Sequence, residues 1–175
     1  MAQAIKMKQK NYRVAIKLSY TGQAPPLTSK EIESLLKENN IARICSHNKD
    51  GTIHAAPVSY IYMNGQIVIG SIASSRKTRN IRRNNDVTML IDTERGQGIL
   101  IYGKAELDYE NVDQLAVLVW EKALPTYPKD KIERLVKAYL DIVKYVIVKV
   151  TPQRIVTFDY TKDDIYSNLV KTYLG

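Results

Sequence analysis

The sequence predicts an α+β fold whose centre is a closed or nearly closed antiparallel β-barrel. Apolar, β-branched segments of strand length cluster along the chain, and they do not alternate one for one with helices as a parallel βαβ sheet requires. Short turn signals such as Asn64-Gly65 separate neighbouring segments, and such turns connect antiparallel strands. A chain of 175 residues is long enough for one well-buried core and too short for two comfortable ones.

The individual elements follow from periodicity and from start and stop signals. Thr28 or Ser29, with Glu31 at capping-box spacing, begins a helix over 29–40. Apolar residues at helical spacing predict further helices over 111–124 and 129–141, and Pro125 ends the first of these two. A short cationic helix follows the third strand. The predicted strands cover 41–48, 52–63, 66–72, 86–93, 99–107, 144–152 and 153–160.

Composition shifts divide the chain into three parts. An N-terminal extension, residues 1–27, holds a short alternating segment over 12–20 and ends in a linker that contains paired prolines. Residues 28–160 contain the predicted barrel and its helices. A C-terminal tail, residues 161–175, mixes polar and apolar residues and has no predicted element.

Charge and cysteine content restrict the classes of protein that remain. The 26 Lys and Arg residues against 18 Asp and Glu residues favour an anionic partner without naming it. The lone Cys45 excludes an internal disulfide framework and is typical of a reducing cytoplasm. The sequence has no membrane-length apolar run, and its basic N-terminus lacks the features of a signal peptide. We therefore expect a cytoplasmic protein without a membrane partner.

The segment "SSRKTRNIRRNN" (74–85) places Arg76 and Lys77 in the first turn of the short helix. The helix dipole disfavours cations there, so the placement requires an explanation. Three interpretations remain: a solvated charged face, a nucleic-acid patch, or a phosphate site. A nucleic-acid patch lacks the interleaved aromatic residues that usually accompany it, and no nucleic-acid partner is expected.

Position favours the phosphate site. Ser74 or Ser75 caps the helix, and Ser71 ends the preceding strand. A phosphate at this point would interact with the dipole, with free N–H groups and with both cations together. The later arginines of the helix are expected to be surface charges.

Three motifs in this order resemble the pyridoxamine-phosphate-oxidase-like, FMN-binding split-barrel superfamily. They are G-x-x-H-x-x-P-V-S-Y from residue 51, S-R-K-x-x-N-I from residue 75, and Y-G-K-A-E from residue 102. The resemblance covers roughly residues 28–160. It implies a six-stranded antiparallel Greek-key barrel flanked by helices, in a homodimer with flavins in clefts at the subunit interface.

The resemblance also assigns binding roles. Arg76 and Lys77 match the phosphate-binding pair of the family, and Ser71 matches a hydroxyl residue that contacts the same phosphate. Gln97 lies near the position of a flavin-contacting glutamine in some members. The strand beside the isoalloxazine ring, which acts largely through backbone groups, matches Pro57, Val58, Ser59 and Tyr60. The side chains of Tyr60 and Tyr62 either line the flavin cleft or pack in the core.

Departures from the family pattern limit the expected activity. Members that oxidise pyridoxamine phosphate carry a C-terminal Arg-x-His motif, whereas this chain has no histidine after His54. Ala56 stands where the oxidase has a further phosphate-binding arginine. We therefore expect an FMN-dependent oxidoreductase with a small-molecule substrate or electron donor, but not a pyridoxamine-phosphate oxidase. No catalytic residue is identified.

Other members of this fold bind the deazaflavin F420 or haem, so two alternatives stay open: an F420-dependent reductase, and a flavin- or haem-binding protein without turnover. Cys45, His47 and His54 lack the paired spacing of a zinc site, and no metal is expected.

Overall fold

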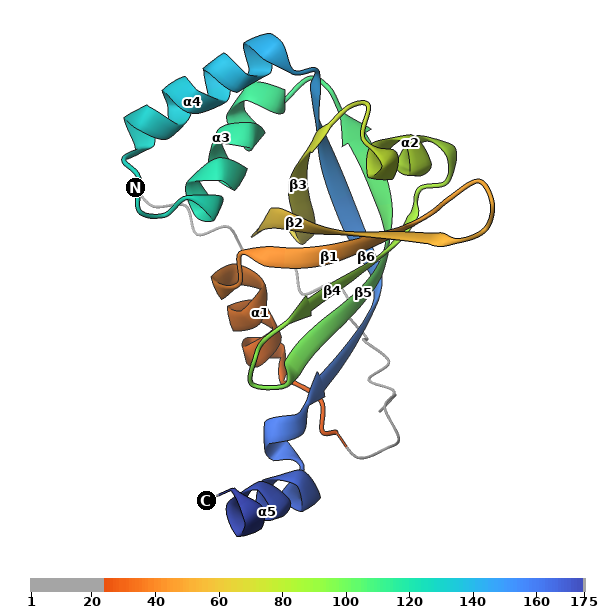
Figure 1. Cartoon of the computed structure of the whole chain (residues 1–175), viewed down its shortest axis with the longest axis vertical. Helices are drawn as coiled ribbons and strands as arrows, with labels where there is room; N and C mark the ends of the chain where they lie inside the picture. Colours follow the sequence, from red (N-terminus) through yellow and green to blue (C-terminus); the bar gives the residue numbers. More distant parts are fainter. Residues whose placement is uncertain (1–23, 175) are drawn as a thin grey trace, which may run out of the picture.

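A closed barrel of six antiparallel strands forms the centre of the computed structural model, which describes residues 24–174 (Figure 1). The strands follow one another around the barrel in the order β1-β2-β3-β6-β5-β4. This arrangement confirms the predicted fold class. The segment predicted over 12–20 lies outside the described residues. The strands are β1 (Ile41–His47), β2 (Ile53–Met63), β3 (Gln66–Ile72), β4 (Asp86–Asp92), β5 (Gln97–Asp108) and β6 (Tyr145–Asp159).

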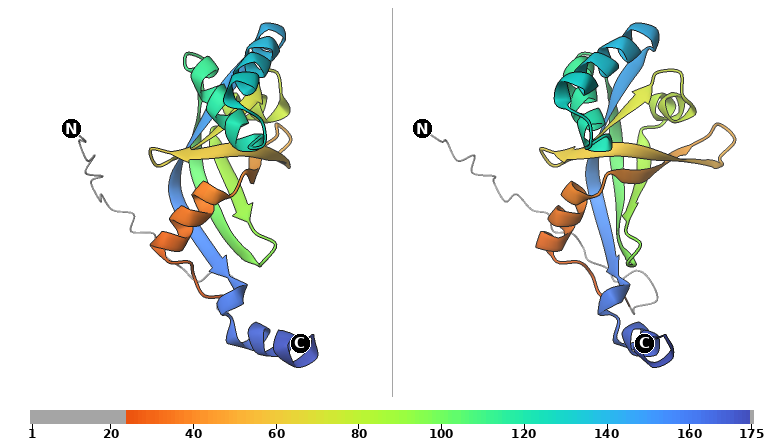
Figure 2. Two further views of the ribbon diagram at one scale, coloured as in Figure 1. Left: turned by 90° about the vertical axis from the view of Figure 1, so that its left-hand side faces the viewer. Right: turned by 60° about the vertical axis from the view of Figure 1, so that its left-hand side comes forward.

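Helices flank the barrel at both ends (Figures 1 and 2). The capping box that predicted the first helix is present, because the Thr28 hydroxyl accepts the Glu31 N–H at 3.3 Å and the Glu31 carboxylate accepts the Thr28 N–H at 2.7 Å. The helical elements are α1 (Ser29–Glu38), α2 (Arg76–Arg83), α3 (Val112–Ala123), α4 (Lys129–Ile142), the 3₁₀ helix η1 (Tyr160–Lys162) and α5 (Asp164–Tyr173). No helix within residues 24–174 is both long and apolar enough to cross a membrane.

The closing strand differs from the prediction. The two strands expected over 144–152 and 153–160 are a single strand, β6, which pairs with β3 and β5. Pro152 does not break it, because this residue stands opposite Gly103 at a register shift in the β5–β6 ladder. A proline lacks the N–H that a regular ladder needs, and a β-bulge is one of the few strand positions that tolerates it.

Two apolar cores position the elements. The larger one fills the barrel with inward-facing side chains of all six strands, and α1 contributes Leu35 and Leu36 to it. The smaller one lies between the outside of the barrel and the α3–α4 pair, and it includes Leu115, Val119 and Trp120 of α3. Figure 2 shows α3 and α4 together at one end of the barrel and α1 toward the other.

The N-terminal end of the described chain packs on the last residues of β6. The Leu27 N–H donates to Thr157 Oγ1 at 3.0 Å, and the Pro25 carbonyl accepts the Asp159 N–H at 2.9 Å. Residues 24–27 therefore pack on β6 just ahead of the boundary drawn at residue 28. Helix α5 occupies most of the C-terminal tail, where no element is predicted, and it projects away from the barrel (Figure 1).

The β1–β2 hairpin extends beyond the closed part of the barrel. Strand β2 pairs with β1 over Ile53–Ser59, but it pairs with β3 only over Tyr60–Met63. One edge of β2 over 53–59 therefore has no partner strand. Figure 1 shows the tip of this hairpin reaching past α2. This open edge and the start of α2 are the two walls of the candidate site.

Candidate functional site

Three hydroxyl groups form a triangle at the start of α2. Ser75 is the N-cap residue, and its Oγ atom accepts the Thr78 N–H at 3.3 Å. Ser71, at the end of β3, lies 3.0 Å from Ser75 Oγ and 2.8 Å from Thr78 Oγ1, and the last two oxygens are 3.0 Å apart. Ser71 and Thr78 are buried. Sequence analysis identified the two serines and missed Thr78, although its place three residues after the N-cap was available as a signal.

The triangle can donate hydrogen bonds toward a ligand. Thr78 Oγ1 lies 3.1 Å from the Ile72 carbonyl oxygen, and a carbonyl can only accept, so the Thr78 proton is used there. Thr78 Oγ1 is then free to accept from Ser71 or Ser75. Ser71 can also donate to the Ile72 carbonyl at 3.4 Å, and the Ser75 proton can be directed either within the triangle or to a group bound above the first turn of α2. Hydroxyl donors at a helix N-terminus suit an anion.

Two cations lie beside these hydroxyls. Arg76 is exposed and Lys77 is half-buried, and the first turn of α2 contains no acidic residue. Neither cation forms an ion pair within the described residues. Burial lowers the pKa of the Lys77 amine. The hydrogen bonds from Thr52 lower the pKa of Asp50 at the tip of the β1–β2 hairpin, and the positive charge of Arg76 lowers it further.

The opposite wall offers backbone groups. The Tyr60 N–H donates to the Asn40 carbonyl at 3.3 Å, so the polar backbone groups of Tyr60 point toward β1. The N–H and carbonyl groups of successive residues in a strand point to opposite edges. Ser59, Pro57 and Ala55 consequently turn their polar backbone groups toward the edge without a partner strand. Pro57 supplies only a carbonyl, and its missing N–H costs nothing at an open edge. Ala55 supplies an N–H and a carbonyl, and Ser59 supplies its N–H, because the Ser59 carbonyl lies beside the last β2–β3 pair and accepts from β3.

The side chains of this strand take a different role from its backbone. Val58 and Tyr60 are buried inside the barrel, and Tyr60 is 0% exposed. The Lys122 amine lies 4.3 Å from the centre of the Tyr60 ring, and burial raises the pKa of the Tyr60 phenol. Of the two alternatives for the tyrosines, packing in the core is correct for Tyr60, and Tyr62 also packs against that core. The polar backbone groups of Tyr60 point toward β1, so neither the side chain nor the backbone of this residue faces the open edge.

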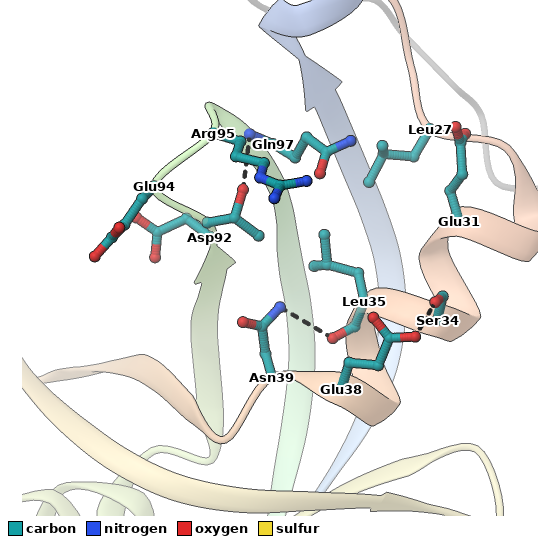
Figure 3. A pocket seen from close by; sticks show the side chains of 11 residues that line it. Leu27, Glu31, Ser34, Leu35, Glu38, Asn39, Asp92, Glu94, Arg95 and Gln97 are labelled. Carbon is teal, nitrogen blue, oxygen red and sulfur yellow. Dashed lines mark hydrogen bonds between the residues drawn. The ribbon is translucent and has the colours of Figure 1, made fainter.

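Gln97 lies apart from the other predicted residues. It begins β5, whereas the α2 region contacts β5 near Ala105, whose N–H donates to the Asn85 carbonyl at 2.8 Å. The eight steps along the strand from Gln97 to Ala105 span roughly 27 Å. The Gln97 amide donates to Asp159 Oδ2 at 2.9 Å. It lines a separate pocket of about 720 Å³ between α1 and the β4–β5 turn (Figure 3).

One chain therefore brings together part of the predicted site. Gln97 is not part of this assembly within a single chain. Residues 24–174 contain no group of three His, Cys, Asp or Glu side chains that could hold a metal ion. Ser71, Ser75, Arg76 and Lys77 gather at the start of α2, and the backbone of Pro57, Ser59 and their neighbours forms the facing edge.

The family of the chain follows from its sequence and fold together. Residues 28–167 match the family model described as pyridoxamine 5'-phosphate oxidase, which is most of the chain. The chain belongs to this family, and the resemblance seen in its motifs is confirmed. No curated protein sequence matches the chain.

Solved structures agree on the fold. A conserved hypothetical protein of Mycobacterium tuberculosis has a TM-score of 0.68 and 24% identity, with 79% of this chain and 88% of that chain covered. A protein named F420 reductase has a TM-score of 0.56 and 18% identity over 70% and 94% of the two chains. The haem storage protein of Vibrio cholerae has a TM-score of 0.56 and 12% identity over 73% and 92%. At these identities the likeness extends to the fold alone.

Proposed function

We propose that this protein is an FMN-dependent oxidoreductase that binds the FMN phosphate at the start of α2. The observation that carries the proposal is the pair of cations, Arg76 and Lys77, beside the hydroxyls of Ser71 and Ser75, with no acidic residue in that turn. Cations at a helix N-terminus repel the dipole unless an anion binds there. A terminal phosphate would contact both cations, the hydroxyls and the free N–H groups of α2.

The open edge of β2 supports a place for the flavin ring. A flavin needs apolar contact for its body and hydrogen bonds for its carbonyls and ring nitrogens. The Ser59 and Ala55 N–H groups can donate to such acceptors, and the Pro57 and Ala55 carbonyls can accept from the ring N–H. When bound, FMN supplies hydride and electron transfer. The chain itself would bind and orient this cofactor.

We also propose that the cofactor lies at the interface of a homodimer. Gln97 is far from α2 in its own chain, so it would reach the flavin only from a second copy. Ile41 and Ile53, on the same outer face of the β1–β2 hairpin, are 57% and 54% exposed. Covering these side chains would favour association. The single Cys45 suits a cytoplasmic location.

Two alternatives have support of their own. A structure named F420 reductase and one named haem storage protein share the fold. Ser71, Ser75, Arg76 and Lys77, which together form the phosphate cradle of α2, would also hold the phosphate of F420. Haem has no phosphate to place there. FMN is preferred because the chain belongs to the pyridoxamine 5'-phosphate oxidase family. Its motifs resemble those with which FMN-binding split barrels hold the flavin phosphate.

The absorption spectrum of the purified protein, loaded with each cofactor in turn, tests the proposal. FMN gives the two visible bands of an oxidised flavin, F420 gives one band, and haem gives a Soret band. Retention of FMN through gel filtration is expected. Anaerobic bleaching of the flavin bands by reduced nicotinamide then indicates an oxidoreductase. Failure to retain FMN, with retention of F420 or haem, would replace the proposal by one of the alternatives.

A further inference from the structure

Asn80, in the second turn of α2, ties this helix to the tip of the β1–β2 hairpin. Its side chain is 4% exposed, and its Nδ2 group donates to Ser46 Oγ at 3.2 Å and to Asn48 Oδ1 at 2.9 Å. Its Oδ1 atom accepts from Arg83 at 3.4 Å, and Arg83 also donates to the His47 carbonyl. The amide nitrogen of Asn80 thus joins α2 to the hairpin directly. The amide oxygen contacts Arg83 of the same helix, which itself reaches the hairpin.

The barrel itself gives this part of the hairpin little support. Strand β1 pairs with β4 only over Arg43–Ser46, and β2 pairs with β3 only over Tyr60–Met63. Asn48 and the turn that follows lie beyond both ladders. The position of the hairpin tip relative to α2 therefore depends on the hydrogen bonds from Asn80 and Arg83.

These hydrogen bonds join α2, which contains one wall of the candidate site, to the hairpin that contains the other. The phosphate cradle belongs to the first turn of α2, and the open edge belongs to β2 over 53–59. We propose that Asn80 is a positioning residue that holds the cradle and the β2 edge at the separation one FMN molecule requires. This inference rests on the proposed function.

The consequence differs between ligands. Inorganic phosphate would touch only the cradle, whose Ser71, Ser75 and Thr78 contacts do not involve Asn80. FMN would touch both walls and so would depend on their separation. In Asn80→Ala we expect phosphate affinity to change by less than about twofold and FMN affinity to fall about tenfold, as for the loss of one to two buried hydrogen bonds.

The closing experiment measures FMN and inorganic phosphate affinities by calorimetry in the full chain and its variants. Asn80→Asp is a second variant, because it keeps the side-chain volume and the acceptor for Arg83 and removes both donors. Asn84→Ala is the matched control. Asn84 is the C-cap of the same helix, and its Oδ1 accepts the Asp86 N–H at 2.9 Å. The control should leave the ratio of the two affinities unchanged.

Hydrogen exchange of the cofactor-free protein provides an independent measurement. Amides over 47–56 should exchange faster in Asn80→Ala than in wild type, and Asn84→Ala should not reproduce this change. Unchanged exchange there, or a parallel loss of FMN and phosphate affinity, overturns the inference. Equal FMN affinity in wild type and Asn80→Ala overturns this inference and leaves the proposed function standing. Absence of FMN binding by the wild-type chain overturns the proposed function as well.

Discussion

Replacing Arg76 and Lys77 together with alanine should release FMN while leaving the barrel folded. A hydrogen bond between a charged donor and a phosphate contributes about 1.5–3 kcal/mol. Arg76 is exposed and belongs near the lower value, whereas half-buried Lys77 is less screened by water. The sum of about 3–4 kcal/mol corresponds to a weakening of roughly 10²- to 10³-fold in the dissociation constant.

Quenching of flavin fluorescence measures this change directly. Titration with FMN and with riboflavin separates the two walls of the site, because riboflavin has no phosphate. The variant should lose FMN affinity and keep the riboflavin affinity of wild type. Its thermal unfolding temperature should equal or exceed that of wild type, since two cations leave the positive end of the helix dipole.

A variant of equal charge change serves as the control. Arg79→Ala with Arg82→Ala also removes two cations from α2, but from positions beyond its first turn. This control should bind FMN within a few-fold of wild type. The phosphate assignment is refuted if the control loses as much affinity as Arg76→Ala with Lys77→Ala, or if the latter retains FMN at wild-type affinity.

Other measurements test the site and the fold. Burial lowers the pKa of Lys77, so the cofactor-free protein loses this charge at a lower pH than an ordinary lysine would. FMN affinity measured by calorimetry should therefore fall as pH rises through that range. Lys77→Arg should remove this pH dependence. Gly103→Ala places a methyl group 2.6 Å from the Thr151 carbonyl oxygen and should lower the free energy of unfolding in urea by about 1–3 kcal/mol. The hydrogen bond from Lys149 holds the pKa of Asp108 well below its ordinary value, so this carboxylate stabilises the fold above about pH 4 and the contribution is lost at lower pH. Asp108→Asn should be less stable than wild type at pH 7, and the difference should narrow in acid; an equal difference at every pH would contradict the assignment.

Local signals predicted most elements to within one or two residues. The turn at Asn64-Gly65 lies between β2 and β3, and α1 begins where the capping box at Thr28 placed it. Both signals depend on residues close together in sequence. The division of β6 into two strands was wrong because Pro152 resembles a break when its partner strand is unknown. The bulge that accommodates it exists only in the pairing with β5.

The same distinction applies to the site. Arg76, Lys77 and Ser75 belong to one helix turn, and Ser71 is four residues before its cap, so periodicity and capping preference suffice to group them. The motif that carried the family resemblance includes Asn80, but no rule of spacing links it to Ser46. That contact requires α2 to lie against β1.

The order of apolar and polar residues thus contains the class of fold and the cationic first turn of α2, because both depend on residues close together in sequence. Three features needed the folded chain: the open edge of β2, the burial of the Tyr60 side chain, and the separation of Gln97 from α2. Each depends on which strands meet around the barrel. Strand pairing joins residues far apart in sequence, and the cost of closing such loops is recovered only when the whole core forms.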